Sequence, residues 1–346
     1  MISNCIQRFV RPAIYLICAS LIGLGTGSAH ADDPIKIGIL ATTGSSPIFI
    51  ADERGYFKAE GLKADIHLFS SAHEVTLATA SGDVTVGLAG LGVSFYNLAG
   101  GGALKIIGAQ SRDEVGFPTI AVITAPADQT TITSIRDMAG KRVGFTTMGS
   151  GTHYPLVLLT EKFGLNLADI MAVPLQSVPN ISAAVIGKQV DFGITTPNAA
   201  QQLESKGKAR ILLWVGNETP WQLGALWTNR RSIEQNCDLL ERFVRAYQRG
   251  TADYHAAFNR KDPHGSPVKG PGYDELLELI ASKIGQPKEV ISTAMPYVDP
   301  RARIDIKDVG HQIEVWQRLG LVRPEVKLAD VIDLSFISEP YPGVSY

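Results

Sequence analysis

The chain has 346 residues, a formal net charge of −2 at pH 7, and 45% hydrophobic residues. This length and hydrophobic content suffice for a protein with sizeable buried cores. The nearly balanced charge argues against a nucleic-acid-binding surface and against a polybasic membrane surface. No nucleic-acid partner is therefore expected.

The first 31 residues are typical of an export signal. Arg8 and Arg11 provide positive charge before a short apolar stretch, and Ala29 and Ala31 form a small-residue cleavage site. The apolar stretch is short for a helix that spans a bilayer, although an uncleaved anchor is the alternative. We expect a periplasmic protein whose mature chain begins near Asp32, after cleavage near Ala31.

The rest of the chain contains two copies of one plan, at residues 36–109 and 141–215. The first copy begins KIGILATTGSS and ends with LKIIGA, and the second begins KRVGFTTMGSGT and ends with ARILLWVG. Strands that alternate with helices predict parallel sheets with helices on both faces. The repeat therefore predicts two similar α/β lobes with a crevice between them.

The helices of the first copy have clear boundary signals. Ser46 as N-cap and Pro47 at the first helical position predict one helix start, and Ser71 with Glu74 predicts a capping box. Gly82 is expected to end the second helix. The expected elements are a strand at 35–40, helices at 48–57 and 74–82, a strand at 85–90, a helix at 91–98 and a strand at 104–109.

The second copy repeats this order. Gly164 and Gly187 are expected to end its helices, and Thr196 with Pro197 predicts another helix start. The expected elements are a strand at 143–146, helices at 153–163 and 181–186, and a strand at 191–195. Three later helices, which we expect to brace the first lobe, are predicted at 238–258, 274–284 and 305–319.

Two segments that contain Gly and Pro beside strand-like runs, at residues 108–124 and 214–228, are expected to join the lobes. If both cross between the lobes, the chain after the second copy returns to the first lobe. The expected organisation is then a signal peptide at 1–31, lobe 1 from 32–114 and 219–346, lobe 2 from 115–218, and hinges near 110–119 and 215–223.

Four segments resemble a known family: IADERGYFKAEGL, ATASGDVTVGLAG, KRVGFTTMGSGTHY and AAVIGKQVDFGITTP. They are similar to the solute-binding proteins of ABC importers for nitrate, sulfonates, taurine and related organic anions. This family shares its fold with the thiamine-pyrimidine synthases. The resemblance covers about residues 35–244. It implies a two-lobed periplasmic-binding-protein fold of type II, a ligand in the interlobe cleft, and delivery to the transmembrane subunits of an ABC permease.

In open parallel sheets, ligands bind beyond the carboxyl ends of the strands, where helices begin. Here these loops are rich in glycine and hydroxyl groups, and helix N-termini bind anions through unpaired N–H groups. Any one of the hydroxyl groups is equally suited to capping a helix. The candidate ligand contacts in these loops are Thr43, Gly44, Ser45, Ser46, Gly90, Leu91, Gly92, Thr147, Gly149, Ser150, Gly151, Thr152, Asn180, Thr196 and Asn198.

Two candidates lie at the crossovers. Arg112 is suited to pairing with an anionic ligand, or to an ion pair with Asp113 or Glu114 on a solvated surface. Trp221 is suited to stacking on a ligand ring, or to packing in the hinge. Four further aromatic residues could either form an aromatic wall of the ligand site or belong to the hydrophobic core. They are Phe95, Tyr96, Phe117 and Tyr154.

The sequence thus predicts a non-catalytic binding protein, a monomer without a cofactor or metal, that captures a small organic anion of the sulfonate or aromatic carboxylate type. Only Cys237 follows the expected signal, whereas the resemblance implies a cysteine-rich iron-binding segment in the synthases. The alternatives are a protein that binds or makes a thiamine-pyrimidine precursor, and a free-standing periplasmic ligand sensor.

Overall fold

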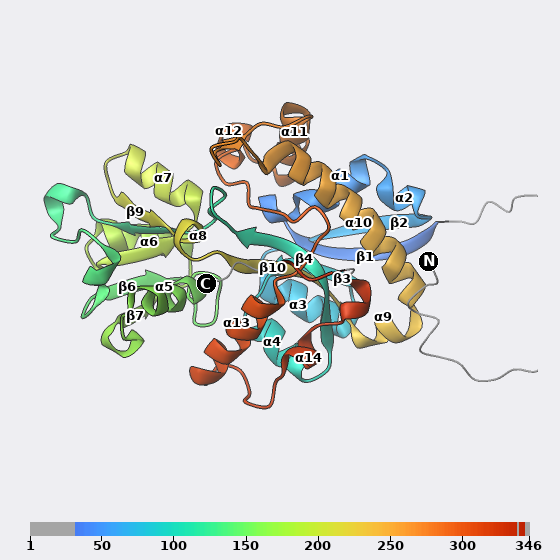
Figure 1. The fold of residues 1–346 in the computed structure, drawn as a ribbon, viewed down its shortest axis with the longest axis horizontal. Coiled ribbons are helices and arrows are strands. Elements are labelled where there is room, and N and C mark those ends of the chain that lie inside the picture. Colours follow the sequence, from blue (N-terminus) through green and yellow to red (C-terminus); the bar gives the residue numbers. More distant parts are fainter. Residues whose placement is uncertain (1–31, 338, 343–346) are drawn as a thin grey trace, which may run out of the picture.

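The computed structural model describes residues 32–337 and 339–342, so the predicted export signal lies outside the described residues. Two five-stranded sheets form two lobes, which lie side by side along the long axis of the molecule (Figure 1). We call them lobe 1 and lobe 2. The predicted α/β fold with two sheets flanked by helices is confirmed.

The two sheets have the same strand order, as the repeat predicts. In each sheet, the second of the four strands of the sequence repeat lies at one edge. A fifth strand, which comes from outside the repeat, lies between the third and the fourth. The order in lobe 1 is β2 (Leu62–Phe69), β1 (Asp33–Leu40), β3 (Val86–Gly90), β10 (Trp221–Asn229) and β4 (Leu104–Asp113). The order in lobe 2 is β7 (Met171–Pro174), β6 (Arg142–Phe145), β8 (Phe192–Thr195), β5 (Ala121–Thr124) and β9 (Arg210–Trp214).

The inserted strands are the ones that follow the crossovers. The chain leaves lobe 1 after β4 and enters lobe 2 as β5, and it leaves lobe 2 after β9 and re-enters lobe 1 as β10. Both β5 and β10 run antiparallel to their neighbours, while the other pairings in each sheet are parallel. A strand that arrives from the other lobe enters at the edge where the parallel strands end, so it runs in the opposite direction.

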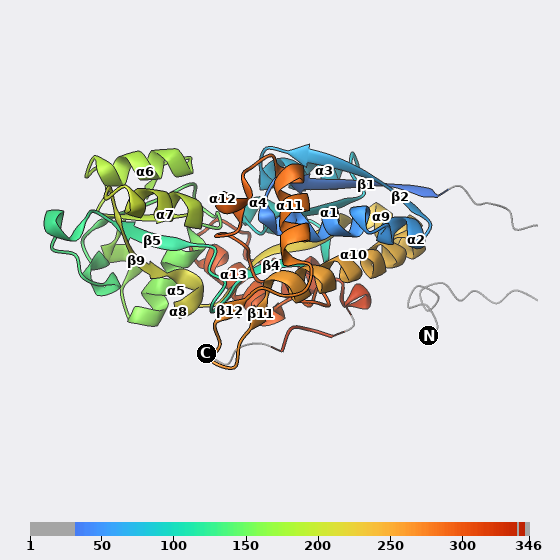
Figure 2. The ribbon, with the colours of Figure 1, turned by 90° about the horizontal axis from the view of Figure 1, so that it is seen from above.

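Helices cover both faces of each sheet (Figures 1 and 2). Around lobe 1 they are α1 (Ser46–Glu53), α2 (Tyr56–Ala59), α3 (Ala72–Ser81), α4 (Val93–Gly100), α9 (Arg230–Gln235), α10 (Cys237–Phe258), α11 (Tyr273–Ile284), α12 (Lys288–Ile291), α13 (Ile306–Arg318) and α14 (Leu328–Val331). Around lobe 2 they are α5 (Tyr154–Phe163), α6 (Val178–Ile186), α7 (Pro197–Ser205) and α8 (Val215–Glu218). No helix in the described ranges is long and apolar enough to cross a membrane.

Several predicted helix boundaries are confirmed. The Ser71 hydroxyl accepts a hydrogen bond from the Glu74 backbone N–H at 3.2 Å. Gly82 and Gly164 end α3 and α5 with φ values of 88° and 65°, a left-handed conformation that glycine adopts without strain. Short 3₁₀ turns add further local order, and a short hairpin pairs β11 (Arg260–Lys261) with β12 (Pro267–Val268) in the segment between α10 and α11.

Other boundaries were predicted wrongly. Ser46 is not an N-cap, because a 3₁₀ turn at Thr43–Ser45 precedes α1 and the Ser46 hydroxyl donates to the Thr43 carbonyl at 2.6 Å. The expected helix at 48–57 is interrupted at Gly55, which has a φ of 68°. β4 extends to Asp113 rather than ending at 109, so the polar residues after Ala109 belong to the sheet.

Helix α13 joins the two lobes in addition to the two crossovers. It contacts β10 in lobe 1, and its Trp316 ring stacks on His153 of lobe 2 with ring centroids 5.4 Å apart. The Tyr154 hydroxyl of α5 donates to Asp308 Oδ1 at 2.9 Å. One hydrophobic cluster includes both Trp316 and the apolar residues of α5, so the core continues from one lobe into the other.

Candidate functional site

A cavity of about 470 Å³ lies between the lobes, at the carboxyl ends of the parallel strands. We call it the cleft. Both lobes and both crossovers contribute to its wall, as does the chain after α11. The lining residues belong to segments 40–44, 90, 110–111, 119–120, 146, 151–152, 196–198, 223 and to five positions between 284 and 296.

The lining of the cleft is neutral and aliphatic. Its polar groups are hydroxyls and amides, from residues such as Thr43, Ser111, Thr152, Asn198 and Gln286. None of the described residues that line it is Asp, Glu, Lys, Arg or His, and none is aromatic. A ligand in the cleft would therefore meet hydrogen-bonding groups and methyl groups, rather than a formal counter-charge.

Ser111 has the polar group best placed for a ligand. Its side chain is on the carboxyl-terminal part of β4, and the residue is 2% exposed. The hydroxyl is buried and has no hydrogen-bond partner among the described residues, although it lines the cleft. A buried hydroxyl without a protein partner costs free energy unless water or a ligand pairs with it, so this group is available to a ligand in the cleft. The neighbours of the lining, Ser45 and Thr195, also bury hydroxyls without partners in the described structure.

Three hydroxyl groups form a triangle on the lobe 2 side of the cleft. Thr146 Oγ1 lies 2.7 Å from Thr152 Oγ1 and 3.0 Å from Ser150 Oγ, and the other two oxygens are 3.1 Å apart. Thr152 Oγ1 also accepts from the Thr146 backbone N–H at 2.9 Å. This triangle fixes the loop between β6 and α5, so that Gly151 and Thr152 face the cleft.

Helix α7 begins at the cleft. Thr196 is its N-cap and Pro197 its first residue, but no side chain caps the helix. The first N–H groups of a helix have no partner inside the helix, and the helix dipole makes them attractive to an anion. The start of α7 therefore provides donors beside the amide of Asn198.

The chain around α12 forms part of the cleft wall. The Thr43 hydroxyl donates to the Ala294 carbonyl at 2.8 Å, which fixes this segment to the loop after β1. The Thr293 hydroxyl donates to Asn198 Oδ1 of lobe 2 at 3.2 Å. This segment of lobe 1 therefore contacts the opposite lobe across the cleft mouth.

The structure brings together seven of the predicted contact residues. These lining residues are Thr43, Gly44, Gly90, Gly151, Thr152, Thr196 and Asn198. Ser45 and Ser150 lie directly beside lining residues. The structure does not place the remaining loop candidates in the lining, namely Ser46, Leu91, Gly92, Thr147, Gly149 and Asn180.

Two of these six, both in lobe 2, use their polar groups within the protein, as Ser46 does in lobe 1. The Gly149 carbonyl accepts a hydrogen bond from the Val93 backbone N–H at 3.1 Å, which joins lobe 2 to lobe 1. Asn180 lies inside α6, and its Nδ2 donates to the Leu175 carbonyl at 2.8 Å. Both positions follow strands, as predicted, but their polar groups are used within the protein.

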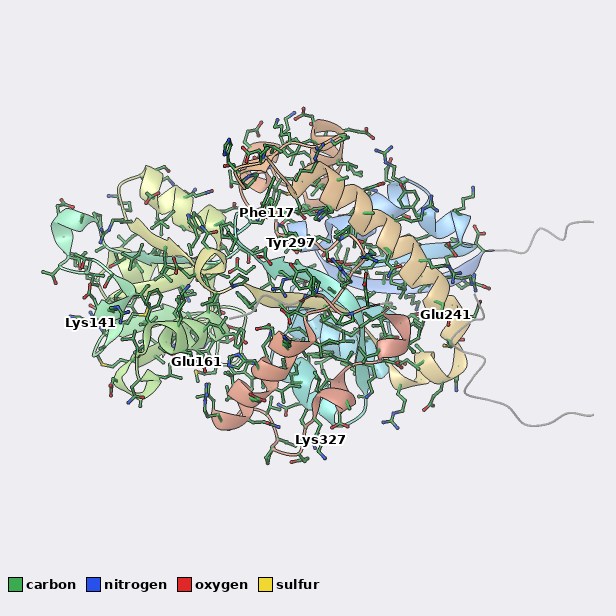
Figure 3. All side chains as sticks on the ribbon, viewed as in Figure 1. Phe117, Lys141, Glu161, Glu241, Tyr297 and Lys327 are labelled. Atoms are coloured by element: carbon green, nitrogen blue, oxygen red, sulfur yellow. The ribbon has the colours of Figure 1, made fainter. Side chains whose placement is uncertain are left out.

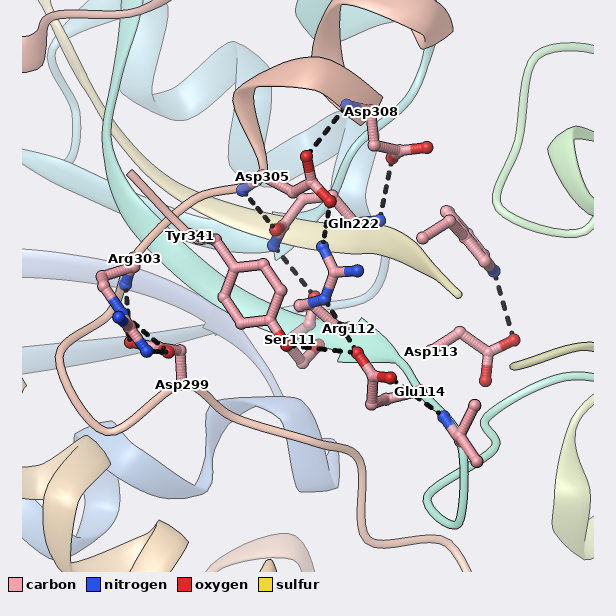
Figure 4. A network of polar contacts seen from close by, with 12 residues as sticks. Ser111, Arg112, Asp113, Glu114, Gln222, Asp299, Arg303, Asp305, Asp308 and Tyr341 are labelled. Atoms are coloured by element: carbon pink, nitrogen blue, oxygen red, sulfur yellow. Dashed lines mark hydrogen bonds and ion pairs between the residues drawn. The ribbon is translucent and has the colours of Figure 1, made fainter. Parts of the chain in front are cut away.

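Arg112 lies outside the lining, at the centre of a buried polar network (Figure 4). Its Nη1 donates to Asp305 Oδ2 at 2.8 Å and its Nε to Glu114 Oε2 at 3.2 Å. The guanidinium also lies 4.3 Å from the centre of the Tyr341 ring. Burial lowers the pKa of Arg112, but the two carboxylates outweigh it and raise the pKa overall. The expected ion pair with Glu114 is present, but it is buried rather than on a solvated surface, and the closer partner is Asp305.

Trp221 also lies outside the lining. It is fully buried, and its Nε1 donates to Asp113 Oδ2 at 3.1 Å. The Tyr154 ring packs edge-on against it at a centroid distance of 5.3 Å. Phe95, Tyr96 and Tyr154 are buried as well, so three members of the expected aromatic wall belong to the core.

Sequence reasoning missed Gln110, Ser111 and the segment after α11. A longer strand at 104–113 would have placed the polar pair Gln110–Ser111 at the carboxyl end of β4, which is where ligands bind. For residues 284–296, no local motif indicates that the chain returns to the cleft. No cluster of three His, Cys, Asp or Glu suited to a metal is found within residues 32–337 and 339–342.

The model of the family described as NMT1/THI5 like matches residues 42–258. The chain belongs to the NMT1/THI5-like family. This match confirms the resemblance inferred from the sequence motifs. The family's fold is also seen in the periplasmic aliphatic sulphonate binding protein SsuA from Escherichia coli. It is similar to this chain with a TM-score of 0.68 and 18% identity, over 88% of this chain and 98% of that one.

Curated relatives include both a synthase and a binding protein. The 4-amino-5-hydroxymethyl-2-methylpyrimidine phosphate synthase of Schizosaccharomyces pombe is 30% identical over 44% of this chain and 42% of its own length. The taurine-binding periplasmic protein of Escherichia coli is 26% identical over 61% of this chain and 64% of its own. The chain spans about half the length of the first curated relatives it matches.

Proposed function

We propose that this NMT1/THI5-like protein is the periplasmic substrate-binding component of an ABC importer. In this account it captures a small organic anion by closure of the two lobes and delivers it to the transmembrane subunits of a permease. The observation that carries the proposal is the cleft, a neutral cavity of about 470 Å³ with contributions from both lobes. Its relatives named as sulphonate- and taurine-binding proteins support the same role.

Neutral donors suit a singly charged anion. The backbone N–H groups at the start of α7, the Ser111 hydroxyl and the amide of Asn198 can each donate to a carboxylate or sulfonate oxygen. A hydrogen bond to a charged group contributes more to the binding free energy than a bond to a neutral group. A site of this kind therefore binds an anion without a counter-charge, and it can still release the anion to a permease. We therefore assign ligand contacts to Thr43, Thr152, Thr196, Asn198 and Ser111.

A binding role is favoured over catalysis by the same lining. Acid–base and nucleophilic catalysis require groups such as His, Cys, Lys or a carboxylate within reach of the substrate. The described residues that line the cleft include none of these types. The cleft is suited to holding a ligand rather than transforming it.

A neutral pyrimidine is the second candidate ligand. The uncharged lining favours it, since amide and hydroxyl groups can pair with ring nitrogens and exocyclic groups. The pyrimidine phosphate synthase among the relatives supports this candidate.

A thermal-shift screen of the purified protein distinguishes the candidates. The panel contains alkanesulfonates, aromatic carboxylates, nitrate and pyrimidines. A ligand at one hundred times its dissociation constant should stabilise the protein by about 2.7 kcal/mol. Stabilisation by a sulfonate or carboxylate supports the proposal, stabilisation by pyrimidines alone replaces it with the second candidate, and no shift with any compound contradicts both.

A further inference from the structure

A second cavity, of about 370 Å³, lies next to the cleft. We call it the vestibule. The same three segments line both cavities: residues 116–120, 197–201 and 291–296. Within each segment some residues face the cleft and others the vestibule, so the two spaces share their walls. Thr293 of the vestibule bonds to Asn198 of the cleft, which marks the boundary between them.

The vestibule differs from the cleft in its chemistry. Four aromatic side chains line it, Phe117 (labelled in Figure 3), Trp214, Phe258 and Tyr273, whereas no described aromatic residue lines the cleft. Phe258 packs against Tyr273 at a centroid distance of 5.0 Å. Trp214 is in lobe 2, at the end of β9, while Phe258 and Tyr273 belong to helices of lobe 1. An occupant of the vestibule would therefore contact aromatic groups of both lobes.

A positive charge lies at the edge of the vestibule. Lys269 lines it, and its Nζ is 4.4 Å from the centre of the Tyr273 ring. Its ion pair with Asp274, at 3.1 Å, is exposed and so contributes little. A lysine in the vestibule, next to a neutral cleft, attracts anions toward the cleft without fixing them inside it.

We propose that the vestibule is a second subsite, which binds an aromatic or planar apolar group of the same ligand whose anionic head occupies the cleft. This inference rests on the proposed function and extends it to a bipartite ligand. The aromatic group lies between Trp214 on one side and the Phe258–Tyr273 pair on the other. Ring pairs gain from offset or edge-on packing as well as from burial. Because the two lobes provide opposite walls, this group also adds to the free energy of closure.

Trp214 gives the subsite its own spectroscopic readout. The other three tryptophans, Trp221, Trp227 and Trp316, are at most 1% exposed and line neither cavity. Trp214 is half-buried and lines the vestibule. A change in fluorescence with a ring-bearing probe that exceeds the change with the short probe, and that is lost in Trp214→Ala, therefore reports on the vestibule.

The test compares probes with one head group and two tails, by calorimetry and by tryptophan fluorescence. The probes are ethanesulfonate with 2-phenylethanesulfonate, and propionate with 3-phenylpropionate. We expect the phenyl probe of a pair to bind at least tenfold more tightly, which corresponds to about 1.4 kcal/mol, and to change the fluorescence. Trp214→Ala should remove this advantage and leave the affinity for the short probe unchanged.

Two further variants keep the result decisive. Tyr273→Ala, on the opposite wall, should also reduce the phenyl advantage, and it serves if Trp214→Ala does not fold. Phe163→Ala, on α5 and outside both cavities, should change neither affinity. Equal binding of short and phenyl probes, or an advantage that survives in both vestibule variants, overturns the vestibule while the cleft stands. Failure of all four probes to bind overturns the proposed anion function itself.

Discussion

The indole of Trp221 donates a hydrogen bond to the carboxylate of Asp113, with Nε1 3.1 Å from Oδ2. Asp113 ends the strand that leaves lobe 1, and Trp221 begins the strand that returns to it, so the two residues pair across the sheet. The other oxygen of Asp113 accepts from the backbone N–H of Thr119, farther along the first crossover. One carboxylate therefore ties the two crossovers together at the point about which the lobes would move.

Removal of the indole N–H should destabilise this junction. Trp221→Phe removes ring volume and also leaves a buried oxygen of Asp113 unpaired. We expect the unpaired oxygen to lower the free energy of unfolding by about 1–3 kcal/mol, in addition to the effect of the smaller ring. Trp227→Phe is the matched control: Trp227 is also fully buried, but its Nε1 has no hydrogen-bond partner among the described residues. Urea denaturation of both variants measures the difference, and equal destabilisation would contradict the assignment.

Asp113 should make stability depend on pH. Burial raises the pKa of its carboxyl to about 7, although the hydrogen bonds from Thr119 and Trp221 oppose this shift. Between about pH 4 and 7 the folded carboxyl holds a proton that the unfolded chain has released. The free energy of unfolding should therefore fall as pH rises through this window, by up to about 1.4 kcal/mol per pH unit.

Denaturation curves at several pH values test this dependence with Asp113→Asn. The variant cannot titrate at this position, so the stability of the wild type relative to the variant should decline from pH 4 to pH 7 and then level off. A constant difference across this range would show that the carboxyl stays ionised in the folded protein.

A second pH effect is expected where α13 meets lobe 2. His311 Nε2 lies 3.1 Å from Glu161 Oε2, and its Nδ1 lies 2.7 Å from the Tyr154 hydroxyl. The hydrogen bond to Glu161 raises the pKa of His311, with Asp308 and Glu314 adding to the shift. Protonated His311 therefore stabilises the folded protein. This contribution is complete below the pKa of about 6.5 that His311 has in the unfolded chain, and it is lost as pH rises through the higher pKa of the folded state.

His311→Gln should remove this loss of stability on the alkaline side. Melting temperatures at pH 6 and pH 8.5 are the measurement, and Glu161→Gln should flatten the profile in the same way because it removes the partner. A histidine variant with the full pH dependence of the wild type would exclude His311 as its source.

Gly149 is expected to be critical for folding rather than for ligand contact. Its φ is +74°, and a Cβ at this position would lie 2.2 Å from Val93 Cγ2 of the other lobe. Gly140 has a φ of +71° but open space around it, so Gly140→Ala carries the backbone strain alone. We expect Gly149→Ala to lower the melting temperature clearly more than Gly140→Ala. Similar melting temperatures would indicate that the lobes separate at this contact without cost.

The sequence predicted the general architecture because the repeat is explicit in it. The two similar lobes and helix ends such as Gly82 and Gly164 follow from local patterns and from the repeat, whereas the insertion of β10 and β5 into the sheets was not predicted. The lining residues after strands β1, β3, β6 and β8 were predicted for the same reason, since the carboxyl ends of parallel strands meet at one edge. The exact lobe boundaries and the hinge motion stay predictions.

Long-range contacts account for what the sequence did not predict. Asp305 pairs with Arg112 across 193 residues, and nothing near either residue indicates the partner. Likewise, the position of Ala294 over the cleft depends on a hydrogen bond from Thr43, 251 residues away. A hydroxyl at the end of a strand can cap a helix, pair with another loop or face a ligand, and only the tertiary structure separates Ser46 from Ser111.

The most direct test of the binding role is a calorimetric titration of Ser111→Ala with the anion that stabilises the wild type most. The lost hydroxyl has no partner among the described residues, so the variant should fold as stably as the wild type. Because a hydrogen bond to a charged group contributes about 1.5–3 kcal/mol, binding should weaken about tenfold or more. The control is Ser205→Ala, at the exposed end of α7. One-to-one binding that weakens only in Ser111→Ala is the predicted result, and unchanged affinity in a folded Ser111→Ala protein would contradict a ligand in the cleft.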